Sequence, residues 1–134
     1  MFDVLEMGAS GHQAQRTLMD TIAGNIVNAN TTRNAQGQPI PYRRRFVLFA
    51  PGQAGSPDKP GVRVQESELD QSPFQKRHEP GHPDADADGY VKYPNIDLAM
   101  EYVNALEASR AYEANVTMME VSKQMLSASL RLIA

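Results

Sequence analysis

The sequence predicts an α+β protein in which two long terminal helices pair as an antiparallel coiled coil beside a small β-rich middle domain. Two observations lead to this prediction: all nine prolines lie between Pro39 and Pro94, and all seven methionines lie outside that stretch. Because proline interrupts the interior of a helix, long helices are expected only in the proline-free flanks. We therefore expect an N-terminal helical segment at residues 1–30, the middle domain at 31–95 and a C-terminal helical segment at 96–134.

Composition excludes several classes of function. The chain has 134 residues, a formal net charge of -3 and no cysteine. The net negative charge argues against a nucleic-acid partner, and the lack of cysteine excludes thiol catalysis and disulfides. No run approaches the ~20 apolar residues of a membrane span, so no direct membrane insertion is expected. The first residues are acidic where a signal peptide needs basic ones, which predicts that any export occurs without a cleaved signal peptide.

The N-terminal helix is expected to run from about Asp3 to Ala29. Its apolar face follows the i, i+3, i+4 spacing of an amphipathic helix. Gly8 and Gly11 weaken the first half, since each costs about 1 kcal/mol relative to alanine. The residues assigned to an assembly interface on this helix are Leu18, Met19, Ile22 and Ile26.

The C-terminal helix is expected to begin after a cap at Asn95 or Asp97. Its apolar residues keep a 3-4 spacing over about four heptads, as in a coiled-coil seam. At ~1.5 Å per residue the helix would be roughly 55 Å long, too long to fold back into a small globule. Such a stripe predicts burial against the other helix and against neighbouring copies. The residues assigned to the interface here are Tyr102, Leu106, Tyr112, Val116, Met119, Leu126 and Leu130.

The middle region carries strand signals at 44–49, 61–66 and 89–93. Three or four short strands are expected to form one small sheet, which is too small for a deep active-site cleft. The basic triplet Arg43–Arg45 overlaps the start of the first of these segments. One triplet is not a basic patch, so a solvated strand face or a salt bridge to a neighbouring subunit is expected there.

Two motifs in the middle region resemble metal sites. His78-Glu79-Pro80-Gly81-His82 has the spacing of a zinc-protease motif, but that motif needs a helix, and Pro80 and Gly81 interrupt one. The run 84–89 matches the start of a calcium loop, yet Asn95 occupies the twelfth position, where a bidentate glutamate is required. A polar turn and an acidic turn are the favoured interpretations. A calcium-binding module is kept as an alternative, and no catalytic residue, cofactor or metal is expected.

Several segments together resemble the axial proteins of the bacterial flagellar rod and hook, and most closely the proximal rod type. The asparagine-rich signature of that family is matched at 23–32, where it includes Asn25, Asn28 and Asn30. Gly24 and Val27 depart from the family's pattern. The other matching segments, in order, are 42–45, 81–86, 89–91, 94–95 and 109–116, the last with Arg110, Tyr112 and Asn115.

This resemblance implies a non-enzymatic structural subunit of the basal-body rod. Its terminal helices would assemble with other copies and with neighbouring rod proteins, and the rod would transmit torque from the motor to the hook. The resemblance also implies delivery by the flagellar export apparatus and a location in the periplasm. A free-standing coiled-coil adaptor, whose helices are stable in the isolated monomer, is the alternative from another class.

Overall fold

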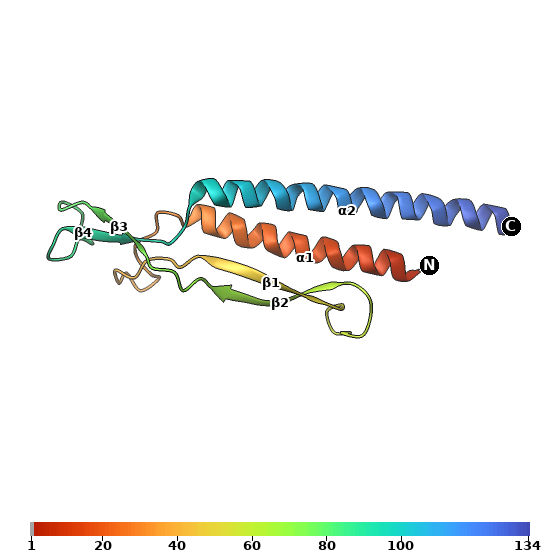
Figure 1. Ribbon diagram of the computed structural model, residues 1–134, viewed down its shortest axis with the longest axis horizontal. Coiled ribbons are helices and arrows are strands. Elements are labelled where there is room, and N and C mark those ends of the chain that lie inside the picture. The colour runs from red at the N-terminus through yellow and green to blue at the C-terminus, as the bar shows by residue number, and fades with distance from the viewer. Residues whose placement is uncertain (1) are drawn as a thin grey trace.

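Two antiparallel helices run side by side along the long axis of the molecule (Figure 1). The computed structural model describes residues 2–134, and the α+β prediction is confirmed. The elements follow in the order α1 (Phe2–Val27), β1 (Arg45–Pro51), β2 (Val62–Leu69), β3 (Gln75–His78), β4 (Tyr90–Tyr93) and α2 (Leu98–Ile133).

The middle region forms two separate antiparallel pairs, β1–β2 and β3–β4, and not the single small sheet that the sequence predicted. The pairs are separate because they lie at different places along the molecule: β1–β2 runs beside α1, whereas β3–β4 lies beyond the end of both helices (Figure 1). No apolar alternation marks β3 in the sequence, since Gln75–His78 is polar throughout and every residue in it is exposed.

The boundaries of the helices follow from their terminal residues. Asp97 is the N-cap of α2, and its Oδ1 accepts hydrogen bonds from the backbone N–H groups of Ala99 and Met100. The 36 residues of α2 include no glycine or proline, so nothing interrupts the helix. At the end of α1, the carbonyl of Gly24 accepts hydrogen bonds from both the backbone N–H and the side-chain amide of Asn28, at 3.1 and 2.8 Å.

The two helices come close together at the glycines of α1. A Cβ atom placed on Gly8 would lie 2.7 Å from Cγ of Met119, and one on Gly11 would lie 3.0 Å from Nδ2 of Asn115. The residue after Gly11, His12, stacks on Tyr112 with 4.2 Å between ring centroids. The glycines that reduce helix propensity therefore also make room for side chains of α2.

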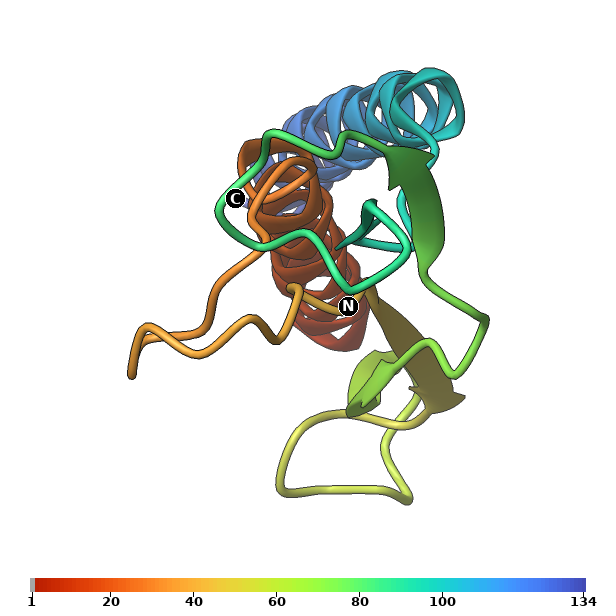
Figure 2. The same cartoon turned by 90° about the vertical axis from the view of Figure 1, so that its left-hand side faces the viewer.

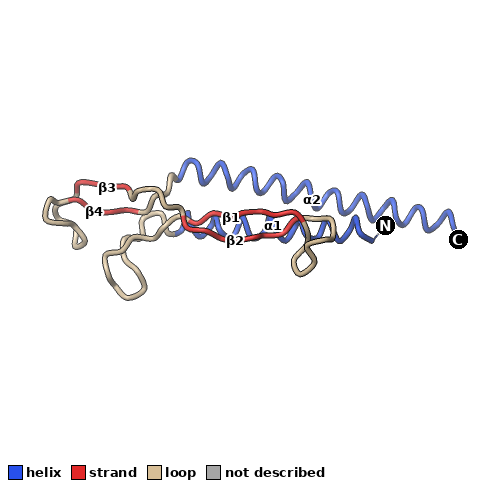
Figure 3. The backbone as a smooth tube through the Cα atoms, turned by 60° about the horizontal axis from the view of Figure 1, so that its bottom comes forward, coloured by secondary structure: helices blue, strands red, loops and turns tan. Residues whose placement is uncertain are grey.

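The β1–β2 hairpin lies along the side of α1 that faces away from α2. The end-on view shows α1 between α2 and the hairpin (Figure 2), and the tube view shows the hairpin running along α1 (Figure 3). Backbone N–H of Val62 donates to Oγ of Ser10 at 3.2 Å, and Lys59 pairs with Glu6 at 3.2 Å. The hairpin is thus held to the first half of α1.

Buried apolar side chains are few, and they concentrate where α1 ends and α2 begins. The buried apolar residues among those described are Ala14, Ile22, Ala29, Val91, Tyr93, Ile96 and Ala108. Toward the opposite end, where α1 starts and α2 finishes, large apolar residues of both helices are exposed. The packing is therefore strong at one end of the helix pair and weak at the other.

Gly8→Val should destabilise the helix pair, although valine is a better helix former than glycine. The added side chain would press on Met119, and overpacking of this kind costs about 1–3 kcal/mol. Urea unfolding followed by circular dichroism measures the loss. Adding Met119→Ala should reduce the cost of the valine, and Ala9→Val at the exposed neighbouring position should have little effect. Equal effects at positions 8 and 9 would contradict the close contact.

Candidate assembly interface

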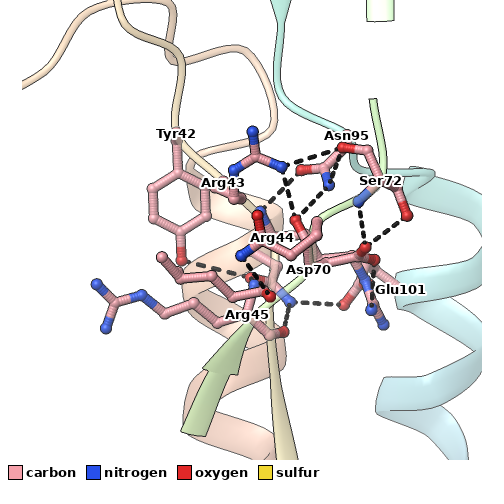
Figure 4. A network of polar contacts seen from close by, with 11 residues as sticks. Tyr42, Arg43, Arg44, Arg45, Asp70, Ser72, Asn95 and Glu101 are labelled. Carbon is pink, nitrogen blue, oxygen red and sulfur yellow. Dashed lines mark hydrogen bonds and ion pairs between the residues drawn. The ribbon is translucent and has the colours of Figure 1, made fainter. Parts of the chain in front are cut away.

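A cluster of polar side chains joins the end of α1, the start of α2 and both ends of the β1–β2 hairpin (Figure 4). We call Asn25, Arg44, Asp70, Asn95 and Glu101 the polar cluster. Glu101, in the first turn of α2, and Asn25, near the end of α1, are each only 1% exposed. Nε of Arg44 donates to Oε1 of Glu101, and Nδ2 of Asn25 donates to Oε2 of Glu101 at 3.2 Å. Both oxygens of the buried carboxylate therefore have partners, as a buried charge requires.

Asn25 also ties α1 to the start of β1. Its Nδ2 donates to the carbonyl of Arg45 at 2.8 Å, and its Oδ1 accepts from the N–H of Arg45 at 3.0 Å. The hydroxyl of Tyr42 donates to the same Oδ1 at 3.3 Å. One side-chain amide thus satisfies both backbone groups of Arg45, as a neighbouring strand would.

Asn95 and Asp70 connect the other side of the cluster. Oδ1 of Asn95 accepts from the backbone N–H of Arg44 at 2.9 Å, and its Nδ2 donates to the carbonyl of Asp70 at 3.0 Å. The carboxylate of Asp70 lies 3.4 Å from Nη1 of Arg44. Hydrogen bonds from the side chain and backbone of Ser72, together with the charge of Arg44, lower the pKa of Asp70. The segment before α2 is therefore fixed to both ends of the hairpin.

The guanidinium of Arg44 is the charge that balances both carboxylates. Burial disfavours its charged form, but the hydrogen bond and charge of Glu101, with Asp70 beside them, raise the pKa of Arg44 above its ordinary value. The sequence suggested a solvated face or a salt bridge to a neighbouring subunit for the triplet 43–45. That expectation was wrong for Arg44, which pairs within its own chain. The side chains of Glu101, Asn25 and Asn95 therefore all have partners within the cluster or on the neighbouring backbone.

The asparagine-rich motif has three different local roles. Asn25 belongs to the polar cluster, and Asn28 caps α1. Asn30 is exposed, and its side chain makes no hydrogen bond within the part of the chain that the structure describes. In the matching segment of α2, Tyr112 and Asn115 face α1, whereas Arg110 is exposed.

The residues assigned to the interface from the sequence fall into two groups. One group is buried or half-buried and consists of Leu18, Met19, Ile22, Ile26, Tyr112, Val116, Met119 and Leu126. The other group is more than half exposed and consists of Tyr102, Leu106 and Leu130. The predicted seam of α2 therefore faces α1 only in part, because Glu101 and Ala108 occupy the buried positions near its start.

A second stripe of apolar residues on α2 was not predicted from the sequence. Met118, Val121, Met125 and Leu132, which we call the outward stripe, are between 48% and 88% exposed. Exposed Ala114 and Ala128 complete a 3-4 spacing from 114 to 132. At 3.6 residues per turn this stripe lies on a different side of α2 from the residues that face α1. The spacing was present in the sequence, but only the position of α1 shows which of the two stripes is uncovered.

The two metal-like motifs lie in the β3–β4 pair and the loop that joins it, and no helix passes through His78–His82. Oε2 of Glu79 accepts from the hydroxyl of Tyr93 at 2.9 Å, and Nδ1 of His82 accepts from the N–H of Asp84 at 3.0 Å. Both side chains therefore have structural partners. In residues 2–134 no group of three or more histidine, aspartate or glutamate side chains is arranged to hold a metal ion.

The aspartates of the acidic turn are also engaged locally. Hydrogen bonds from Arg33 and Thr32 lower the pKa of Asp84, and Arg33 lies 2.7 Å from its carboxylate. Oδ1 of Asp86 accepts from the backbone N–H groups of Asp88 and Tyr90 at 3.0 and 2.9 Å. These are the side-chain-to-backbone bonds of an acidic turn, which was the interpretation favoured from the sequence.

Arg44→Ala should destabilise the protein by about 3 kcal/mol, because it leaves the carboxylate of Glu101 buried without its charged partner. This value is the low end of the cost of breaking a buried ion pair, about 3–5 kcal/mol, because the Arg44 side chain is 26% exposed. Arg43→Ala, which removes a neighbouring arginine bonded to the carbonyls of Asp70 and Ser72, should cost about 1 kcal/mol.

Urea unfolding of the full chain measures both changes. Adding Glu101→Gln to Arg44→Ala should restore part of the lost stability, since the buried group is then neutral. Equal losses from Arg43→Ala and Arg44→Ala, or no recovery in the double variant, would contradict the role given to the Arg44–Glu101 pair.

Comparison with known proteins identifies the family. Residues 87–132 match the family described as flagellar basal body rod FlgEFG protein C-terminal, a range that contains most of α2. The flagellar basal-body rod protein FlgC of Borreliella burgdorferi is 37% identical over 99% of this chain and 97% of its own length. The FlgC proteins of Bacillus subtilis and Salmonella typhimurium are 37% and 38% identical, each over 98% of this chain and 97% of its own length.

These likenesses extend over both helices and the middle region. The uncovered apolar face of α2 is a feature of a protein that packs against others. The chain belongs to the flagellar basal-body rod protein FlgC family and is a structural subunit of the flagellar basal-body rod.

Proposed function

We propose that this subunit joins the rod through its terminal helices, by contact with copies of itself and with neighbouring rod proteins. The observation that carries this proposal is the outward stripe on α2, whose residues are between 48% and 88% exposed. Apolar residues that gather on one face of a protein mark a surface for another protein. Helices of this length gain most of their stability from packing, so a partner is also needed to order the weakly covered end.

We propose that the assembled subunit transmits torque from the motor to the hook. The polar cluster supports this role, because it fixes α1, α2 and the β1–β2 hairpin to one another at one end. A load on one element would pass to the others through buried hydrogen bonds, and rotation of the helices against each other would break them. No catalytic role is proposed, since the polar groups of the cluster are occupied by one another.

The rod is proposed to receive this subunit in the periplasm through the flagellar export apparatus. The small number of buried apolar side chains supports this route, because little packing must be undone when the chain is unfolded for passage. No helix within residues 2–134 is long and apolar enough to cross a membrane. Export without a cleaved signal peptide stays a prediction.

Met118→Asp should abolish or strongly reduce rod assembly while leaving the fold intact. Met118 is 62% exposed, so the new carboxylate is solvated in the free chain. In the rod it would be buried without a partner, at a cost of several kcal/mol. Swimming in soft agar reports assembly, and the amount of the subunit in isolated basal bodies reports incorporation.

Thr117→Asp is the matched control, because Thr117 is exposed on the adjacent side of α2 and the substitution adds the same charge. Cells with this variant should swim. Normal swimming and normal basal bodies with Met118→Asp would show that the outward stripe is not an assembly surface. Cellular levels of both variants, compared by immunoblot, separate assembly from degradation.

A further inference from the structure

The last turn of α2 extends past the described start of α1 (Figure 1). Val4 and Leu5 line a shallow cleft with Leu126 and Ser129, so this is the level at which the two helices last meet. Beyond it lies 130–133, which we call the overhang. Its apolar residues, Leu130, Leu132 and Ile133, are 58%, 88% and 83% exposed. This apolar tip has no covering within the described chain.

A hollow of about 300 Å³ opens nearer the other end, where α1, α2 and the start of β1 meet. Its lining is mixed: the apolar residues are Leu18, Ile22, Phe46, Ala108 and Ala111, and polar or charged side chains, among them Asn104, Glu107 and Arg45, complete it. The two alanines leave the surface of α2 low at this point, so another helix can approach closely. Arg44, at the edge, is already neutralised by Glu101 and Asp70.

The requirement for an open assembly selects between two kinds of contact. If the same face of two copies packed together, the contact would close as a dimer and add no further copies. A contact between two different surfaces repeats from copy to copy and builds a filament. The overhang and the hollow are two such surfaces, and they lie at different levels of one molecule. The overhang cannot enter its own hollow, because the straight helix α2 carries it away (Figure 1).

We propose that the overhang of one copy lies in the hollow of the next, with Leu132 and Ile133 against Leu18 and Ala111. This inference rests on the proposed function, since it names the partner surface for assembly. The distance along α2 from Leu132 to Ala111 sets the offset between neighbouring copies at roughly 32 Å along the axis, at the helical rise of ~1.5 Å per residue.

The chemistry of the two surfaces favours a second copy over a membrane. A helix that lies on a membrane surface carries lysine and arginine along its polar face, whereas the overhang has Arg131 as its one charged residue. The walls of the hollow are helices and a strand held by the polar cluster, so it is formed before the partner arrives. When an uncovered apolar tip meets the apolar part of a preformed hollow, both lose exposed apolar surface.

Cysteine crosslinking tests this contact directly, because the natural chain has no cysteine. Leu132→Cys and Ala111→Cys are combined in one chain, and basal bodies are isolated under oxidising conditions from cells that produce it. A disulfide forms only when two Cα atoms lie within about 7 Å. We expect a ladder of disulfide-linked dimers, trimers and larger species. The matched control pairs Leu132→Cys with Glu113→Cys, at an exposed position on the opposite side of α2 from Ala111, and should remain monomeric.

Several outcomes would overturn the proposed contact. These are dimers without larger species, equal ladders in the test and control chains, or monomers alone in basal bodies from swimming cells. In the last case the proposed function stands while the contact is rejected. Absence of the natural chain from basal bodies would reject both the proposed function and the proposed contact. Leu18→Cys replaces Ala111→Cys in a second pair, so that a folding defect at one position does not decide the result.

Discussion

The buried carboxylate of Glu101 is the constraint on which the rest of the arrangement depends. A charge that is 1% exposed must be matched where it lies, and the match requires Arg44 from the start of β1 and Asn25 from the end of α1. Asn95 then joins the segment before α2 to Arg44. These contacts bring together residues far apart in the chain, so the two helices and the hairpin can have only one relative placement at this end. The small apolar core surrounds the same point.

The opposite end is built differently. There the helices touch through Gly8 and Met119 and through partly exposed side chains, and α2 continues beyond the described start of α1. A monomeric protein would be expected to cover such apolar residues, whereas a subunit of an assembly leaves them for its neighbours. The molecule thus combines a region that is complete by itself with one that requires partners. This division suits a rod subunit, because the complete region sets the geometry in which the uncovered surfaces are presented.

Sequence reasoning predicted the parts of this structure that depend on local pattern. Proline placement and apolar spacing located both helices, and the cap at Asp97 was one of two alternatives. The pairing of β3 with β4 could not be predicted, because Gln75–His78 is polar and exposed. The polar cluster could not be predicted either. In the sequence, Glu101 resembles an ordinary acidic residue in the first turn of a helix, and Arg44 resembles one of three surface arginines. Their burial depends on long-range contacts. The sequence indicated the asparagine motif only as a family signature. The structure adds the physical reason for Asn25: its side-chain amide bonds both backbone groups of Arg45 and the carboxylate of Glu101.

Amide hydrogen exchange along the two helices of the free full-length chain tests the central claim most directly, because exchange reports local opening residue by residue. If the polar cluster fixes one end and the other end awaits partners, the amides of 18–27 and 101–112 should exchange most slowly. Those of 2–8 and 120–133 should exchange fastest, and they should become protected in isolated basal bodies. Uniform protection along both helices of a verified monomer, or the strongest protection at 2–8 and 120–133, would contradict the account.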